Sequence, residues 1–424
     1  MILLLKHVGV LHLVINNLPD TELLHLLELE VKRQKETVNL IPSENYVSKQ
    51  VLQAQSSVLT NKYAEGYPGN RYYSGCTYVD DAETLAIERA KKLFNADHAN
   101  VQPHSGSQAN MGVYFAMLEL GDTVLAMSPA HGGHLSHGAP DSFSGKWYRF
   151  IHYGIDPDTE QLDYNELERL ALQHRPKMIV AGASSYPGTI DFERFRAIAD
   201  AAGSLFMADI AHLAGFVAAC IMPSPVQYAD AVAASTHKSL RGPRGGFILC
   251  KEEFASKIDA AVFPMMQGGP LMHVIAAKAV AFYEAMQPDY VTYQKKVLEN
   301  ASLLAHELKE KGFRLMTGGT GTHLIMVDLA GTGVRGEAAQ ATLDAAGIIL
   351  NGNDVSAPQA GQIGSSLRMG TPAVTSRGFG REEIKQVAGF IADVLADPGD
   401  TNVERKVKEQ VVTLCNRFPA PGLD

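Results

Sequence analysis

Short apolar runs alternate with helix-like segments through the middle of the chain. Four such runs span 122–127, 176–182, 204–209 and 229–235. The stretch 192–203, between the second and third runs, has the spacing of an amphipathic helix. This alternation predicts an α/β fold with a mostly parallel sheet. The run 245–251 follows the fourth run too closely for a helical crossover, so we expect it to pair antiparallel.

The pattern differs on both sides of this central part. Residues 20–33 and 80–94 have helical spacing, with a Gly- and Tyr-rich loop at 63–75 between them. A long helical stretch begins near residue 288 and precedes three short apolar runs, at 324–329, 347–351 and 366–370. A Glu- and Lys-rich helix follows them, which predicts a smaller α+β region.

Three parts are therefore predicted. They are an N-terminal arm and helix at 1–60, a large α/β domain at 61–288, and a small C-terminal α+β domain at 289–424. The Gly- and Ser-rich loop at 352–365 is expected to be mobile. The apolar start, residues 1–15, is too short to span a bilayer and offers no signal-peptide cleavage site, so we expect an arm that packs on the body or on a partner subunit.

Composition narrows the choice of partners. The 424 residues carry 46 acids against 37 bases, a net charge of -9, which argues against a nucleic-acid-binding surface. No stretch reaches transmembrane length, so no membrane partner is expected. The four cysteines are far apart and predict reduced thiols, hence a cytoplasmic location. They are Cys76, Cys220, Cys250 and Cys415.

Polar side chains follow three of the apolar runs. Asp209 ends one run, Ser184 follows another, and His237 and Lys238 follow a third. Because ligands bind at the carboxyl ends of strands in open α/β sheets, these residues predict a pocket. A desolvated lysine there is a Schiff-base candidate, and an aspartate on a neighbouring strand could keep a pyridine nitrogen protonated.

Two further segments allow more than one interpretation. The turn HSGSQAN at 104–110 runs into a helix, so Ser105 and Ser107 suit either a phosphate site or a plain N-cap. The segment HGGHLSH contains His131, His134 and His137. A metal site is one reading, but its two glycines disfavour a rigid ligand helix, and an imidazole stacked on a cofactor ring fits better. No metal is expected.

Two charged residues complete the candidates. Arg368, in SSLRMGTP, could grip a substrate carboxylate or form a surface ion pair. Glu65 lies among the tyrosines of NKYAEGYPGNRYY, where a carboxyl can donate and accept a proton, although a solvated loop glutamate would read the same way.

These motifs together resemble the serine hydroxymethyltransferase family. The resemblance runs from about Leu40 to the C-terminus and keeps the order of the family's motifs. The strings that carry it are NKYAEGYPGNRYY, HSGSQAN, AHGGHLSHG, ADIAH, STHKSLRGPRGG, QGGPLMH and RMGTPAVTSRG.

The resemblance implies fold type I of the pyridoxal-phosphate (PLP) enzymes, with an aspartate-aminotransferase-like large domain. It also implies a homodimer or tetramer whose active sites are built between two subunits. Lys238 would bind PLP as a Schiff base, Asp209 would pair with the pyridine nitrogen, and His134 would stack on the ring. Ser184 and His212 would lie near the ring substituents. The implied phosphate cradle is Ser105, Gly106, Ser107 and His237, with Gly268 and Gly269 from the partner subunit.

The resemblance also implies a substrate site. Arg368 and Ser43 would hold the amino-acid carboxylate. Glu65, Tyr63 and Tyr73 would enter from the partner subunit, with Glu65 as acid and base. Leu135 and Asn353 would contact folate. The implied reaction transfers the hydroxymethyl group of L-serine to tetrahydrofolate, reversibly, and gives glycine and 5,10-methylenetetrahydrofolate.

The chain departs from the family pattern at Pro42, Thr77, Met265–Met266 and Gly321–Thr322. Three alternatives therefore stay open at this point. A sister enzyme on the same scaffold could act on α-methylserine or cleave threonine-like substrates without folate. A protein that binds PLP or RNA without catalysis, and a metal-dependent hydrolase built on HGGHLSH, are the others.

Overall fold

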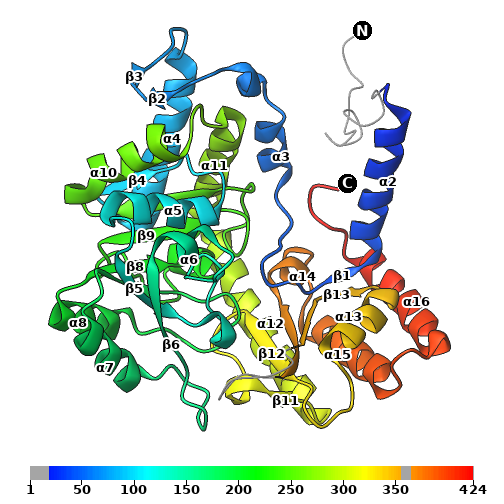
Figure 1. Cartoon of the computed structure of the whole chain (residues 1–424). Helices are drawn as coiled ribbons and strands as arrows, with labels where there is room; N and C mark the ends of the chain where they lie inside the picture. The colour runs from blue at the N-terminus through cyan, green and yellow to red at the C-terminus, as the bar shows by residue number, and fades with distance from the viewer. Residues whose placement is uncertain (1–18, 355–363, 424) are drawn as a thin grey trace, which may run out of the picture.

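The computed structural model describes residues 19–354 and 364–423 (Figure 1). Its larger sheet has seven strands in the order β4-β10-β9-β8-β7-β5-β6. The strands are β4 (His98–Asn100), β5 (Thr123–Met127), β6 (Arg149–Tyr153), β7 (Met178–Ala181), β8 (Leu205–Asp209), β9 (Ala231–Ser235) and β10 (Gly246–Cys250). All five apolar runs of the middle segment form strands, so the α/β prediction is confirmed.

The strand directions also follow the predictions. Strands β6, β5, β7, β8 and β9 are parallel neighbours. Strand β10 is antiparallel to β9, with Gly246 opposite Ser235, and antiparallel to β4 on its other side. The sequence did not reveal β6, because this edge strand exposes Arg149 and His152 and lacks a continuous apolar run.

Helices cover both faces of this sheet. On β5, Val124 and Ala126 point to one core and Leu125 and Met127 to another, as strand alternation requires. The first core includes α5 (Gly106–Met117) and α10 (Ala255–Ala260). The second core includes α4 (Thr77–Phe94), α7 (Tyr164–His174), α8 (Phe192–Ala202), α9 (Ala214–Ala218) and α11 (Met272–Ala285). Short α6 (Phe143–Trp147) precedes β6.

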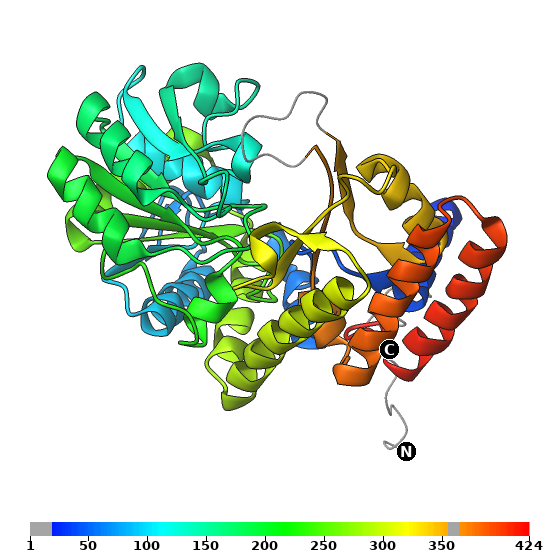
Figure 2. The ribbon, with the colours of Figure 1, turned by 90° about the horizontal axis from the view of Figure 1, so that it is seen from below.

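A second, antiparallel sheet lies in the C-terminal part. Its order is β11-β12-β15-β14. The strands are β11 (Arg314–Leu315), β12 (Leu324–Asp328), β14 (Asn351–Asp354) and β15 (Ser365–Gly370). In Figure 2 this sheet lies between the larger sheet and the C-terminal helices. The helices of this part are α12 (Pro288–Glu310), α13 (Gly336–Ala345), α14 (Pro372–Ser376), α15 (Arg381–Ala396) and α16 (Thr401–Arg417).

The prediction of one strand at 347–351 is wrong. The segment divides into β13 (Ile348–Ile349) and β14, because β13 leaves the second sheet to pair with β1 (Val38–Asn39). This pairing joins segments about 300 residues apart, which local periodicity cannot reveal.

The N-terminal segments pack against both halves of the molecule. Helix α2 (Thr21–Glu36) contacts α16, and α3 (Lys49–Gln55) contacts α11 (Figure 1). A small hairpin, β2 (Gly66–Tyr67) and β3 (Asn70–Arg71), precedes α4. The boundaries at 60 and 288 stay a prediction. The expected arm at 1–15 and most of the loop at 352–365 lie outside the described residues. No helix of the described ranges has the length and apolar character to cross a membrane.

Candidate active site

A pocket of about 210 Å³ lies at the carboxyl ends of the parallel strands. Asp209 ends β8, Ser184 follows β7, and His237 and Lys238 follow β9. Nine of the eleven predicted cofactor residues line this cavity, which we call the Lys238 pocket. Its lining is Ser105, Gly106, Ser107, Asn110, His134, Ala183, Ser184, Asp209, Ala211, His212, Ser235, His237, Lys238 and Arg244.

The surroundings of Lys238 lower the pKa of its side-chain amine. Burial lowers the pKa of its amine to about 8, and the nearby positive charges of Arg368 and Arg244 act in the same direction. The Asp209 carboxylate opposes them but does not outweigh the burial. A neutral amine at the end of a strand is a nucleophile for a carbonyl carbon.

Asp209 stays ionised although it is buried. Burial alone would raise its pKa, but hydrogen bonds from His137 and Asn110 and the neighbouring imidazoles lower the pKa well below its usual range. His137 Nε2 lies 3.0 Å and Asn110 Nδ2 2.8 Å from Asp209 Oδ2, and the Ala211 amide donates to Oδ1 at 2.9 Å. The carboxylate is therefore a fixed negative charge on the pocket floor.

Asn110 and its partner Ser136 were missed as site residues. Asn110 lies on α5 and Ser136 on the loop after β5, and their side chains are hydrogen-bonded at 2.7 Å. His137 was noticed only as part of a histidine cluster. The asparagine in HSGSQAN lies one helical turn after Gly106, which was the available signal.

The N-terminus of α5 faces the pocket. Ser105 Oγ accepts a hydrogen bond from the Gln108 amide at 3.1 Å, so the N-cap interpretation is confirmed. The amides of Gly106 and Ser107 begin the helix at the pocket wall, where the helix dipole favours an anion. A Cβ at Gly106 would clash with Ser235 Oγ, so a larger residue would require the Ser235 side chain to move.

The pocket residues fit a phosphorylated pyridine ring. The N-terminus of α5 suits a phosphate, and Asp209 suits a protonated ring nitrogen. Asn110 Oδ1 is buried and lacks a hydrogen-bond partner within the described part of the chain, which leaves an acceptor for a polar ligand group.

The histidines of the pocket are held neutral. Burial lowers the pKa of His134 and of His237 to about 4, and it also lowers that of His212 well below its usual range. His134 Nδ1 lies 2.7 Å from Ser136 Oγ, and Gly245 N lies 3.4 Å from His237 Nδ1. Among the described residues, no three His, Cys, Asp or Glu side chains gather as metal ligands would.

Arg368, on β15, contacts two residues of the pocket lining. Its Nε and Nη2 donate to the Ser184 carbonyl oxygen at 2.9 and 2.6 Å, and Nη2 lies 3.3 Å from His212 Nε2. Burial lowers the pKa of its guanidinium to about 10, so it stays charged. Within the described residues, Arg368 does not form the surface ion pair that was the alternative. His212 stacks on His323, with ring centroids 5.4 Å apart.

The five residues that the resemblance assigns to the partner subunit lie together, away from the pocket. They are Tyr63, Glu65, Tyr73, Gly268 and Gly269. A Cβ at Gly268 would lie 3.0 Å from Glu65 Oε1, and one at Gly269 would lie 3.1 Å from the Tyr63 ring. The rings of Tyr63 and Tyr73 meet edge to face at 5.4 Å and are 57 % and 44 % exposed. The Glu65 carboxylate raises the pKa of Tyr73. We call these five residues the tyrosine surface; none of them lines the Lys238 pocket.

A buried ion pair fixes the backbone around Glu65. Arg71 Nη1 donates to the carbonyl oxygens of Ala64 and Gly66, on either side of Glu65, at 2.9 and 2.8 Å. Its Nη2 lies 2.6 Å from Glu83 Oε2, and both side chains are almost fully buried. Gln102 Nε2 bridges Glu83 and the Gly66 carbonyl oxygen.

None of the six predicted substrate residues lines the pocket, and three of them remain to be located. Leu135 is 66 % exposed, Asn353 is exposed on β14, and Ser43 is half-buried in the turn after β1. The Gly370 amide at the end of β15 donates to the Leu40 carbonyl oxygen at 2.7 Å, which brings the turn of Ser43 to the strand of Arg368.

All four departures from the family pattern lie within the described residues, and Thr77 is exposed at the start of α4. Pro42 packs directly on Gly370. The Gly321 amide donates to the Pro187 carbonyl oxygen at 3.0 Å, and Thr322 precedes the buried His323. Met265 is exposed, and Met266 packs near Gly112 of α5. The departures at Pro42 and at Gly321–Thr322 thus lie on the Arg368 side of the site.

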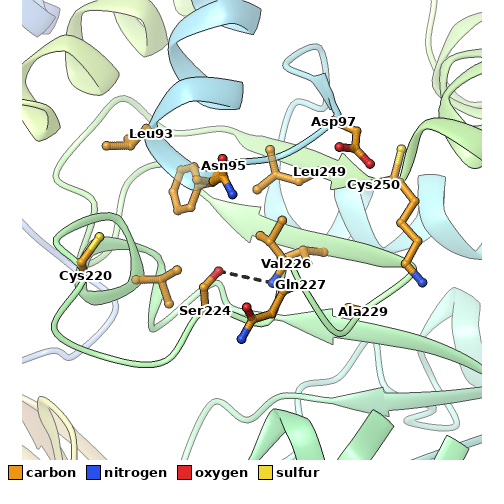
Figure 3. A pocket seen from close by; sticks show the side chains of 14 residues that line it. Leu93, Asn95, Asp97, Cys220, Ser224, Val226, Gln227, Ala229, Leu249 and Cys250 are labelled. Atoms are coloured by element: carbon orange, nitrogen blue, oxygen red, sulfur yellow. Dashed lines mark hydrogen bonds between the residues drawn. The ribbon is translucent and has the colours of Figure 1, made fainter.

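A larger cavity of about 440 Å³ has different chemistry (Figure 3). It lies where β9 begins and β10 ends, away from Lys238, and most of its walls are apolar. Figure 3 shows Cys220 and Cys250 on opposite sides of it. All four cysteines are free, as predicted, but Cys220 is exposed. The cavity holds none of the predicted site residues.

Comparison with known proteins agrees with this geometry. The sequence model of the family described as "Serine hydroxymethyltransferase" matches residues 17–391. A serine hydroxymethyltransferase of Dehalococcoides mccartyi strain CBDB1 is 58% identical over 407 residues, which cover 96% of this chain and 98% of the relative. One of Methylococcus capsulatus strain Bath is 56% identical over 403 residues, which cover 94% and 96%. The chain therefore belongs to the serine hydroxymethyltransferase family.

Proposed function

We propose that this protein is a PLP-dependent serine hydroxymethyltransferase, which reversibly transfers the hydroxymethyl group of L-serine to tetrahydrofolate and forms glycine and 5,10-methylenetetrahydrofolate. The observation that carries the proposal is the pairing of a deprotonable Lys238 with an ionised Asp209 on neighbouring strand ends. PLP, when bound, supplies the electron sink that makes a bond at the amino-acid Cα labile.

The chain's own residues supply binding and proton control. Lys238 offers the neutral amine that holds the cofactor carbonyl, and Asp209 keeps a positive ring nitrogen charged. The first amides of α5, with Ser105, Ser107 and His237, suit the phosphate. His134, held neutral by burial, suits an aromatic ring face. Asn110 and His137 fix the Asp209 carboxylate.

The substrate carboxylate falls to Arg368 in this proposal. Its guanidinium already presents two N–H groups to one carbonyl oxygen, that of Ser184, and a carboxylate is a stronger acceptor for the same fork. Ser43 lies on the turn that packs against the end of β15, and in this proposal it binds the carboxylate together with Arg368. Leu135 and Asn353 are exposed contacts for folate.

We further propose a homodimer, or a pair of dimers, with shared active sites. The tyrosine surface is exposed, holds a carboxyl that could exchange a proton with the serine hydroxyl, and does not line the pocket of its own protomer. Supplying this surface to a second protomer's pocket would complete both sites. The division at residues 60 and 288 and a cytoplasmic location belong to the same proposal; the free thiols support the latter.

The test is methylenetetrahydrofolate formation by the purified protein from L-serine, beside α-methylserine and allo-threonine, with and without tetrahydrofolate. Fast, folate-dependent cleavage of serine is the expected result. Activity restricted to α-methylserine, or folate-independent cleavage of allo-threonine alone, would refute the assignment. Pro42 and Gly321–Thr322, near Arg368, would then be the first residues to test as the cause of the different substrate preference.

A further inference from the structure

A fully buried lysine lies behind the N-terminus of α5. Lys278, on α11, is 1 % exposed. Its Nζ donates to the carbonyl oxygens of Val101 at 2.6 Å, Pro103 at 2.9 Å and Gly246 at 2.8 Å. Within residues 19–354 and 364–423 it forms no ion pair with a carboxylate. Burial lowers the pKa of its amine to about 7, and the negative charge of Glu83 acts in the opposite direction.

The three carbonyl oxygens belong to the support of the phosphate cradle. Val101 follows β4, Pro103 lies two residues before the N-cap Ser105, and Gly246 begins β10. The Gly246 amide also donates to the Pro103 carbonyl oxygen at 3.0 Å. A Cβ at Gly246 would clash with the Ser105 carbonyl oxygen and lie 3.1 Å from the Gly106 nitrogen. One ammonium thus joins two backbone segments that adjoin the first turn of α5.

The charge of Lys278 reaches the pocket. Burial and then Lys278 lower the pKa of His104. Lys278 also contributes to the lowered pKa of His237, which lines the Lys238 pocket, although burial, Lys238 and Arg244 contribute more there. Because burial keeps both imidazoles uncharged, a cation fixed on the far side of the cradle adds to its positive potential. A phosphate dianion at the N-terminus of α5 would add to the negative charge of Glu83 and favour the ammonium form of Lys278.

We propose that Lys278 is a positioning residue of the cofactor-phosphate site. Its ammonium holds segment 101–106 in place and attracts the phosphate without touching it. This inference rests on the proposed use of PLP. It predicts an effect that is specific to the phosphate group of the ligand, which a purely structural lysine would not produce.

The experiment compares two ligands on full-length protein freed of its cofactor. PLP and pyridoxal, which lacks the phosphate, are titrated by absorbance into the unmodified protein, Lys278→Met and Lys278→Gln. We expect both variants to bind PLP about tenfold more weakly and pyridoxal less than about twofold more weakly. Lys251→Met is the matched control, because Lys251 is paired with Asp230 and borders the larger cavity.

An equal loss of affinity for both ligands, or no loss for either, would overturn the inference. The Lys278→Gln variant retains two N–H donors for the carbonyl oxygens, so it decides the question if Lys278→Met does not fold. Failure of the unmodified protein to bind PLP would instead overturn the proposed function, and this inference with it.

Discussion

The Lys238 pocket and the tyrosine surface differ in how far their ionisable side chains are buried. In the pocket, burial lowers the pKa of Lys238 so that its amine can be neutral, whereas hydrogen bonds and neighbouring imidazoles keep Asp209 charged although it is buried. On the tyrosine surface, Tyr63 and Tyr73 are exposed. The backbone around Glu65 is held by the buried ion pair of Arg71 and Glu83. In the proposed function, one protomer thus carries the cofactor residues and, on a separate surface, the proton-transfer residue Glu65, which would act in the pocket of a second protomer.

The largest expected effect is on the pocket side. Lys238→Ala should reduce turnover of serine by about 10³-fold, because the amine that exchanges with the substrate is lost. Steady-state rates of methylenetetrahydrofolate formation measure it, with Lys251→Ala as the control. Turnover near that of the unmodified protein would remove Lys238 from the reaction.

The next effect is on the tyrosine surface. Glu65→Gln should lower kcat by about 10²-fold while leaving cofactor binding intact, because only the proton transfer at the substrate hydroxyl is removed. The measurement is kcat beside the absorbance spectrum of the bound cofactor. A changed PLP affinity would mean that Glu65 belongs to the cofactor site instead.

Mixing these two variants tests whether the regions work in different protomers. If sites are shared, a hybrid dimer of Lys238→Ala and Glu65→Gln has one intact site. Refolding an equal mixture should then restore about a quarter of the original specific activity. No recovery, despite hybrid dimers seen by mass spectrometry, would confine each site to one chain.

A tenfold effect per pH unit is expected for Lys238 itself. Its unprotonated fraction falls below its pKa of about 8, because burial, Arg368 and Arg244 disfavour the charged form. Capture of PLP by cofactor-free protein should therefore quicken with pH and level off above pH 8. Stopped-flow absorbance measures this; a rate still rising tenfold per unit between pH 9 and 10 would indicate an ordinary lysine.

The smallest effect concerns His323. Arg368 always donates, so His212 Nε2 accepts, and His212 Nδ1–H faces His323 Nε2 at 3.3 Å. His323→Met removes that acceptor and should raise the KM for serine about fivefold with little change in kcat. His323→Gln, which keeps an acceptor, should restore KM. Equal effects of both variants would reduce His323 to a packing residue.

Much of the pocket was predictable because strand ends are local features. Lys238, Asp209 and Ser184 each follow an apolar run, and the topology of parallel sheets then brings them together. The strand prediction that failed, at 347–351, depends on a pairing with a distant segment. Residues 348–349 pair with 38–39, which no local pattern encodes.

Networks between elements were equally hidden from the sequence. Asn110 and Ser136 acquire their role only when α5 lies over the loop after β5. Lys278 did have a local signal, a lone lysine within the apolar stretch IAAKAVAF, but its three carbonyl partners come from two segments more than 30 residues away.

The place of β4 at the sheet edge has a consequence for biosynthesis. Within the described structure β4 pairs with β10 alone, about 150 residues later in the chain. The turn that leads from β4 into α5 is held by earlier residues through Gln102, which bonds Glu83 and Gly66, and by β10 and α11, which are made much later. The cradle of a nascent chain is therefore complete only after β10 and α11 have left the ribosome, and on the proposed use of PLP the cofactor is captured after most of the protein has been synthesised.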